Sequence, residues 1–247
     1  FFWTLEEFCR DELLPFLFAD AEDDPQQYTM IVQNVTAKLK REHTALPGGG
    51  ISLDGLAVRT FPELLDAVRD RVESDATQVD WAGRAIGQGT IGAFVRRLYG
   101  AQKHVEHLIR GDVAHAERHR IRRQAQVTVV DIHNLNDRAK RFVVGVVLRR
   151  AFDEKERTGL SRPLLFVVLD ELNKYAPRDG SSPIKEILLD IAERGRSLGV
   201  ILIGAQAHAD DQGLGAVGQV VEVHDADLRV SGVDAVRAAW RQVAPDQ

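Results

Sequence analysis

Two adjacent carboxylates, Asp170 and Glu171, stand near the end of the apolar run LLFVVLDELNKYAP (164–177). Such a run is typical of a buried strand, and α/β proteins bind ligands beyond the carboxyl ends of their strands. At that place Asp170 would supply the hard oxygen ligand that a nucleotide-bound Mg²⁺ requires. Glu171 could polarise the water that attacks a γ-phosphate. The alternative is a strand that ends in an ordinary polar turn.

Three further polar residues lie in the stretch ERGRSLGVILIGAQ (193–206). Gln206 ends its apolar strand, where an amide could sense the γ-phosphate or orient the attacking water. Arg194 and Arg196 lie at the end of the preceding helical pattern. Arginines there either complement the helix dipole or act on the nucleotide of a neighbouring subunit by offsetting transition-state charge. Both alternatives remain open.

The first part of the chain has the apolar periodicity of helices. Thr4 with Glu7 predicts a capping box, and apolar residues recur on one helical face over 28–39. Thr60 predicts the start of a third helix, and another helix is expected over 91–109. The stretch 41–56 is polar and contains Gly48, Gly49 and Gly50, which predicts a loop.

From residue 127 onward, strand and helix patterns alternate. Strands are expected at 127–132, 164–169 and 200–204, and helices at 138–152 and after Ser182 and Pro183. This alternation predicts right-handed crossovers and a parallel sheet, which is an α/β fold. Asp170 and Gln206 would then lie at the same edge of that sheet.

Composition limits the class of protein. With 247 residues, 44% hydrophobic and 28% charged, the chain can bury a core and is predicted to be globular. It shows neither a membrane-spanning run nor a signal peptide, and its one cysteine, Cys9, fits a reducing compartment, so we expect a cytoplasmic protein. Because the chain has 32 basic and 37 acidic residues, its net charge is negative, and nucleic-acid binding would need a local basic surface.

Three other motifs have alternative interpretations. The basic cluster Arg118, Arg120, Arg122 and Arg123 either contacts DNA phosphates or faces water. His115 and His119 are four residues apart but lack the H-E-x-x-H pattern, so a solvated face is favoured over a zinc site. The stretch GQGTIG (87–92) matches G-x-G-x-x-G, but no strand precedes it, which favours a turn before a helix over a dinucleotide site.

The stretch 164–177 followed by IAERGRSLGVILIGAQ (191–206) resembles the Walker B to sensor block of HerA-type ATPases, relatives of the FtsK DNA pumps and of type IV secretion ATPases. Upstream, residues 1–39 resemble the helical region that follows the P-loop in bacterial members. Residues 126–152, QVTVVDIHNLNDRAKRFVVGVVLRRAF, resemble the strand and helix before Walker B. The resembling stretches are spread over roughly residues 1–206.

This resemblance implies an incomplete RecA-like P-loop NTPase sheet (126–206) after an N-terminal helical region (1–125). It implies that Asp170 is the Walker B ligand of Mg²⁺, Glu171 the catalytic glutamate and Gln206 the sensor. Arg194 or Arg196 would be a finger acting in trans. The implied cofactors are ATP and Mg²⁺. The implied assembly is a hexameric ring that translocates double-stranded DNA, in some members with a nuclease partner.

Two features depart from the family pattern. The chain contains no GxxxxGK[ST] motif and no Gly-Lys pair, so we expect the phosphate-binding loop to precede Phe1 and this fragment to be inactive alone. Residues 207–247 do not match the family and are either divergent or the product of a shifted reading frame. Two alternatives follow: a non-catalytic nucleotide-binding or structural subunit, and a secretion ATPase that moves protein.

Overall fold

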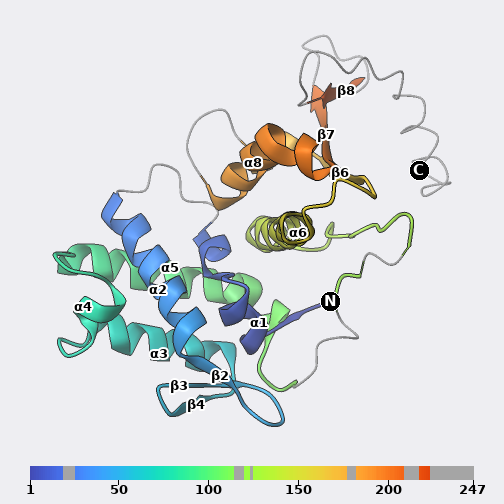
Figure 1. The fold of residues 1–247 in the computed structure, drawn as a ribbon. Coiled ribbons are helices and arrows are strands. Elements are labelled where there is room, and N and C mark those ends of the chain that lie inside the picture. The colour runs from blue at the N-terminus through green and yellow to red at the C-terminus, as the bar shows by residue number, and fades with distance from the viewer. Residues whose placement is uncertain (19–25, 114–119, 123–124, 177–181, 209–216, 223–247) are drawn as a thin grey trace. The chain divides into compact units, whose positions relative to one another are not determined.

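The computed structural model describes residues 1–18, 26–113, 120–122, 125–176, 182–208 and 217–222 of the chain (Figure 1). Contacts divide the chain into two compact units. The first unit contains residues 1–150 and 179–187, and the second contains residues 151–178 and 188–247. Helices α6 (Asp137–Thr158) and α8 (Pro183–Leu198) each begin in the first unit and end in the second. The protein is therefore of the mixed α/β class.

The first unit is mainly helical, as the apolar periodicity predicted. Apart from α6 and α8, its helices are α1 (Leu5–Arg10), the 3-10 helix η1 (Leu14–Phe18), α2 (Gln26–Glu42), α3 (Phe61–Glu73), α4 (Gln78–Trp81), α5 (Gln88–Val105) and the 3-10 helix η2 (Glu106–Leu108). At the start of α1 the Thr4 hydroxyl accepts the N–H of Glu7 at 3.1 Å, and the Glu7 carboxylate accepts the N–H of Thr4 at 3.0 Å. The predicted capping box is confirmed.

Aromatic side chains build much of the core of the first unit. Trp3 stands edge-on to Phe142 with ring centroids 5.4 Å apart, and Phe8 stands edge-on to Phe61 at 5.5 Å. Rings in this arrangement add electrostatic attraction to the area that they bury. The apolar face predicted for α2 is confirmed, because all of its members are buried: Tyr28, Ile31, Val32, Val35 and Leu39.

The glycine-rich stretch is more ordered than predicted. Within 41–56, strand β2 (His43–Ala45) pairs antiparallel with β3 (Ile51–Leu53), which pairs antiparallel with β4 (Leu56–Val58). The prediction of a loop was therefore wrong at β2 and β3, because these strands are too short to give a clear alternation. Gly49, at φ +104°, lies in the turn between them, and a Cβ there would stand 2.7 Å from the carbonyl oxygen of Gly111.

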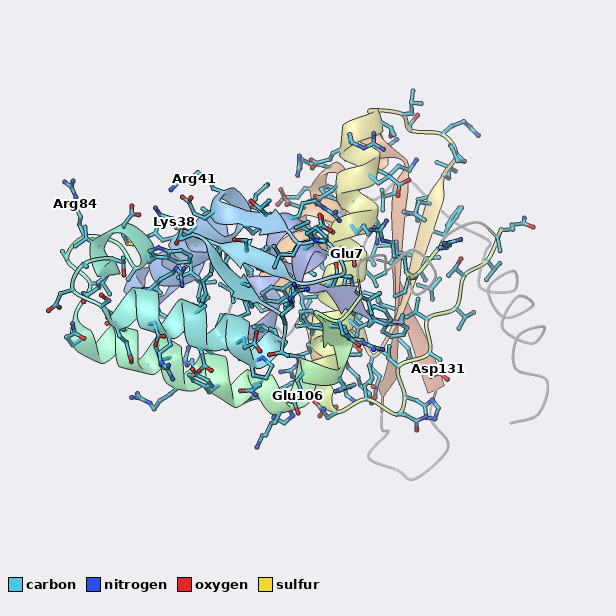
Figure 2. The ribbon with its side chains drawn as sticks, turned by 90° about the horizontal axis from the view of Figure 1, so that it is seen from below. Glu7, Lys38, Arg41, Arg84, Glu106 and Asp131 are labelled. Carbon is cyan, nitrogen blue, oxygen red and sulfur yellow. The ribbon has the colours of Figure 1, made fainter. Side chains whose placement is uncertain are left out.

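The predicted strand at 127–132 is also wrong. These residues have no strand pairing within the described chain, and Val127 and Val129 are 60% and 61% exposed. A β-branched sequence becomes a strand only when a neighbouring backbone accepts and donates its ladder bonds. At the end of this segment, Asp131 Oδ1 accepts the N–H of His133 at 3.0 Å, which lowers the pKa of Asp131 (Figure 2).

The second unit contains the three-stranded sheet that carries the candidate site. Its elements are β6 (Leu165–Asp170), the short helix α7 (Leu172–Tyr175), β7 (Val200–His208) and β8 (Val217–Glu222), in the strand order β6-β7-β8. Strands β6 and β7 are parallel and connected through α8, as predicted. Strand β8, which lies in the segment that does not match the family, pairs antiparallel with β7. Its valines fit this pairing.

Two short strands in the first unit join distant parts of the sequence. Strand β1 (Trp3–Thr4) pairs parallel with β5 (Ile109–Arg110), with Trp3 opposite Ile109.

The helices can also be compared with the length of a membrane span. Among the helices of the described chain, none is both long enough and apolar enough to cross a membrane.

Candidate active site

The register of β6 and β7 brings the predicted site residues to one edge of the sheet. Asp170, the last residue of β6, lies opposite Ala205 of β7, and Gln206 is the next residue of β7. Glu171 directly follows β6. The prediction that Gln206 ends its strand was wrong, because β7 continues to His208 and pairs there with β8. Asp170, Glu171 and the backbone of Gln206 still come together where β6 ends, at the edge at which ligands of α/β proteins bind. The side chain of Gln206 lies outside what the structure describes.

Glu171 has an unusual backbone conformation. Its φ of 54° and ψ of 44° place it in the left-handed region, at the start of α7. For a residue with a Cβ this conformation costs roughly 1–2 kcal/mol. Left-handed residues other than glycine and asparagine occur preferentially where surrounding contacts and function require them. Glu12, Asp54 and Ala85 also have positive φ, and Glu171 is the member of this group that the sequence predicts to be catalytic.

Both carboxylates of the pair have defined partners. Asp170 Oδ1 accepts the N–H of Glu171 at 2.9 Å, and Glu171 Oε2 accepts a charge-assisted bond from Lys174 Nζ at 2.6 Å. The side chains of Glu171 and Lys174 are each 51% exposed. Glu171 thus reaches solvent with one oxygen tied to a cation.

Asp170 fits the role of a ligand for nucleotide-bound Mg²⁺. Its side chain is exposed at the edge of the sheet, and within the described chain no protein group bonds its Oδ2. A carboxylate oxygen of this kind is the ligand that Mg²⁺ prefers, together with phosphate oxygens and water. Among the described residues no group of three or more His, Cys, Asp or Glu could hold a metal ion.

The two candidate finger arginines differ. Arg194 Nη1 donates to Glu156 Oε1 at 2.7 Å, its Nη2 lies 3.5 Å from Asp190, and its guanidinium lies 5.2 Å from the centre of the Phe152 ring. These contacts tie the end of α6 to α8. Arg196, in the last turn of α8, is exposed. The contacts of Arg194 favour a structural role for that residue, whereas Arg196 has an exposed side chain at the end of the helix.

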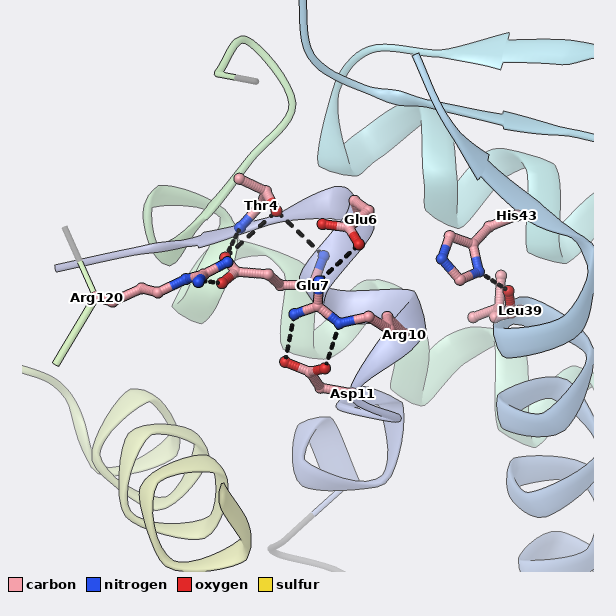
Figure 3. A network of polar contacts seen from close by, with 8 residues as sticks. All are labelled: Thr4, Glu6, Glu7, Arg10, Asp11, Leu39, His43 and Arg120. Atoms are coloured by element: carbon pink, nitrogen blue, oxygen red, sulfur yellow. Dashed lines mark hydrogen bonds and ion pairs between the residues drawn. The ribbon is translucent and has the colours of Figure 1, made fainter. Parts of the chain in front are cut away.

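The arginines of the basic cluster differ in their surroundings. Arg120 Nε donates to Glu7 Oε1 at 2.5 Å, and the side chain of Glu7 is fully buried (Figure 3). Arg122 is exposed. Arg118 and Arg123 lie outside the described residues, as do His115 and His119. Arg120 is therefore engaged in a partly buried ion pair, and Arg122 is the described member of the cluster with an exposed side chain.

Two other sequence features have structural roles. Gly87 caps the start of α5, so the interpretation of GQGTIG as a turn before a helix is confirmed. Cys9 is buried, and burial raises the pKa of its thiol. A thiol without an accessible thiolate is not a nucleophile at neutral pH.

Sequence reasoning missed three residues around Glu171. Lys174 is three residues after Glu171, a spacing that puts both side chains on one face of a helical turn. Leu172 of α7 lies over Gly204 of β7, where a Cβ would stand 2.4 Å from Leu172 Cδ2. The charge at Lys174 could have been found from its spacing. The contact between Leu172 and Gly204 depends on the register of the sheet, which the local sequence pattern does not predict.

Neither the protein-family models nor the curated proteins compared with the chain gave a match.

Proposed function

We propose that the chain forms part of an ATP-hydrolysing motor subunit of the HerA/FtsK type that translocates or processes double-stranded DNA. The observation that carries this proposal is the edge formed by β6 and β7, where Asp170 lies opposite Ala205 and where Glu171 and Gln206 are the next residues along the chain. Phosphoryl-transfer sites need a metal ligand and a water-orienting group at such an edge. The resemblance of residues 164–177 and 191–206 to a Walker B to sensor block supports the same function.

Each site residue has one role in this proposal. Asp170 binds Mg²⁺ together with the phosphates of ATP, and bound Mg²⁺ neutralises charge on the transferred phosphoryl group. Glu171 accepts a hydrogen bond from the attacking water through Oε1, because Oε2 is bonded to Lys174. Gln206 helps to orient that water. Arg196 reaches the nucleotide of a neighbouring subunit.

The proposed fold and assembly follow from the same resemblance. The fold would be RecA-like, with β6 and β7 as two strands of a larger parallel sheet. The assembly would be a cytoplasmic hexameric ring around double-stranded DNA, with a nuclease as a possible partner class. Arg122 is an exposed residue that could contact phosphates, and such contacts would make DNA binding weaken as salt rises.

A second candidate is a non-catalytic nucleotide-binding or structural subunit. The specific observation in its favour is the absence of GxxxxGK[ST] from the sequence, since that loop cradles the phosphates and supplies the lysine that binds them. ATP hydrolysis by the protein expressed from its complete gene separates the two candidates. Stimulation by double-stranded DNA, rather than by an unfolded polypeptide, separates a DNA motor from a secretion ATPase that moves protein.

The decisive experiment compares Glu171→Gln with Asp170→Asn in the protein expressed from its complete gene. Glu171→Gln keeps the side-chain shape but removes the charge, so the hydrolysis rate should fall about 10²- to 10⁴-fold while ATP affinity stays nearly unchanged. Asp170→Asn should also weaken Mg²⁺-dependent nucleotide binding, because a neutral amide is a poorer ligand for a hard dication. Rates are measured by phosphate release and affinities by calorimetry. Hydrolysis at the unmodified rate by Glu171→Gln would remove the catalytic assignment.

A further inference from the structure

The left-handed backbone of Glu171 needs contacts that hold it. Three hydrogen bonds close the turn: Glu171 N–H to Asp170 Oδ1 at 2.9 Å, Lys174 N–H to the Glu171 carbonyl at 2.8 Å, and Ala176 N–H to the Leu172 carbonyl at 2.9 Å. All three act within residues 170–176. They fix the shape of the turn but do not fix its place on the sheet.

One packing contact links this turn to the neighbouring strand. Gly204 is buried in β7, opposite Leu169 of β6. A Cβ at Gly204 would stand 2.4 Å from Cδ2, 3.1 Å from Cβ and 3.2 Å from Cγ of Leu172. Because glycine has no side chain, position 204 leaves the space that the Leu172 side chain occupies. Leu172 directly follows Glu171, so its place on β7 also determines where Glu171 stands.

Gly204 is also close in sequence to the predicted sensor. Gln206 follows two residues later on the same strand, one position beyond the partner of Asp170. The strand from Gly204 to Gln206 is paired with β6 through Gly204 and Ala205, and with β8 through all three residues. A strand that is paired on two sides holds its residues at fixed positions, because its backbone cannot shift without breaking ladder hydrogen bonds.

We propose that Gly204 and Leu172 are positioning residues for ATP hydrolysis. Their contact holds Glu171 at a fixed place relative to the strand that carries Gln206, so that both groups address the same water molecule. The inference rests on the proposed function, in which Glu171 orients that water. It adds a requirement that the carboxylate chemistry alone does not contain, namely that residue 204 has no side chain.

The test uses Gly204→Ala, Leu172→Ala and the double variant in the protein expressed from its complete gene. With double-stranded DNA at saturation, each single change should lower kcat for ATP about 10- to 100-fold, as small misplacements of a reacting group do. KM for ATP should stay within about 2-fold, because neither residue is placed on the nucleotide. The double variant should be no slower than the slower single variant, because Leu172→Ala removes the Cδ2 and Cγ atoms that the methyl group at position 204 would displace.

A matched control separates positioning from loss of stability. Gly145→Ala introduces a methyl group with the same crowding in the first unit, where a Cβ would stand 2.4 Å from Phe16 Cδ1. This change should lower the thermal midpoint of unfolding, as Gly204→Ala does, and leave kcat unchanged. A fall of kcat in Gly145→Ala as large as in Gly204→Ala would overturn the inference, since crowding anywhere would then slow the enzyme.

Other outcomes separate this inference from the proposed function. If Glu171→Gln is slow while Gly204→Ala and Leu172→Ala hydrolyse ATP at the unmodified rate, the positioning role is overturned and the proposed function stands. If the decrease of kcat in the double variant equals the product of the two single decreases, the positioning role is also overturned, because the residues would then act independently. Hydrolysis by Glu171→Gln at the unmodified rate would overturn the proposed function itself.

Discussion

Glu7 and Glu171 have the same side chain but differ in burial and in the number of their hydrogen-bond partners. Glu7 is fully buried and accepts hydrogen bonds from the Thr4 N–H, the Thr4 hydroxyl and Arg120 (Figure 3). Glu171 is 51% exposed, accepts one bond from Lys174, and stands on a left-handed backbone. A buried carboxylate with several donors is bound into the structure. An exposed carboxylate on a strained turn keeps an oxygen available for a ligand.

The comparison predicts its largest effect at Glu7. Glu7→Ala leaves the partly buried Arg120 and the N–H of Thr4 without their acceptor, so the free energy of unfolding should fall by about 3–5 kcal/mol. Glu6→Ala is the matched control one residue earlier. Glu6 makes an exposed ion pair with Arg10, which is worth about 0–1 kcal/mol. Urea denaturation followed by circular dichroism measures both.

Arg120→Met extends this experiment to the other partner. If Glu7 and Arg120 act as a pair, the double variant should be more stable than the sum of the single losses predicts, by roughly 0.5–3 kcal/mol. Equal losses for Glu7→Ala and Glu6→Ala would contradict the structural role given to Glu7, and would leave Arg120 available for phosphates.

A smaller effect is expected at the two threonine caps. Thr4 and Thr60 both accept the N–H of a glutamate three residues later, at 3.1 Å and 3.3 Å, but Thr4 is buried beside Glu7 while Thr60 is exposed. Thr4→Ala should cost about 2 kcal/mol and Thr60→Ala about 1 kcal/mol of unfolding free energy. The same denaturation assay gives both values. A larger loss at Thr60 would show that burial does not strengthen the network around Glu7.

The smallest effect on stability is expected at the candidate site. Lys174→Ala breaks an ion pair whose two side chains are each 51% exposed, so the free energy of unfolding should change by less than about 1 kcal/mol. Lys174→Arg, which keeps the charge, serves as the control in the same assay. A loss as large as that of Glu7→Ala would end the contrast between the two glutamates, since Glu171 would then also be a structural residue.

The sequence predicted best those elements that a local pattern defines. The capping box of Thr4 and Glu7, the buried face of α2, and the parallel pair β6 and β7 were all predicted from spacing and periodicity. The predicted strand at 127–132 was wrong for the opposite reason. Its valines give a strand pattern, but strand formation depends on a pairing partner that no local pattern contains.

The candidate site was predictable to the same degree. Asp170, Glu171 and Gln206 follow from the ends of apolar runs, and the sheet register places their backbones at one edge. The roles of arginines were not predictable, because a charge cluster has the same sequence whether its members face solvent or a buried acid. Arg120 pairs with Glu7, which lies more than a hundred residues earlier, and Arg194 pairs with Glu156 of another helix.

The pairing of β1 with β5 has a consequence for synthesis of the protein on the ribosome. Trp3 forms its ladder with Ile109, and its ring packs on Phe142, so neither partner exists when Trp3 leaves the ribosome. At roughly 5–20 residues per second, the wait for residue 109 lasts about 5–20 s. During this time the apolar segment around Trp3 has no native partner on these elements. The nascent chain therefore presents an apolar segment that chaperones can bind before the first unit has folded.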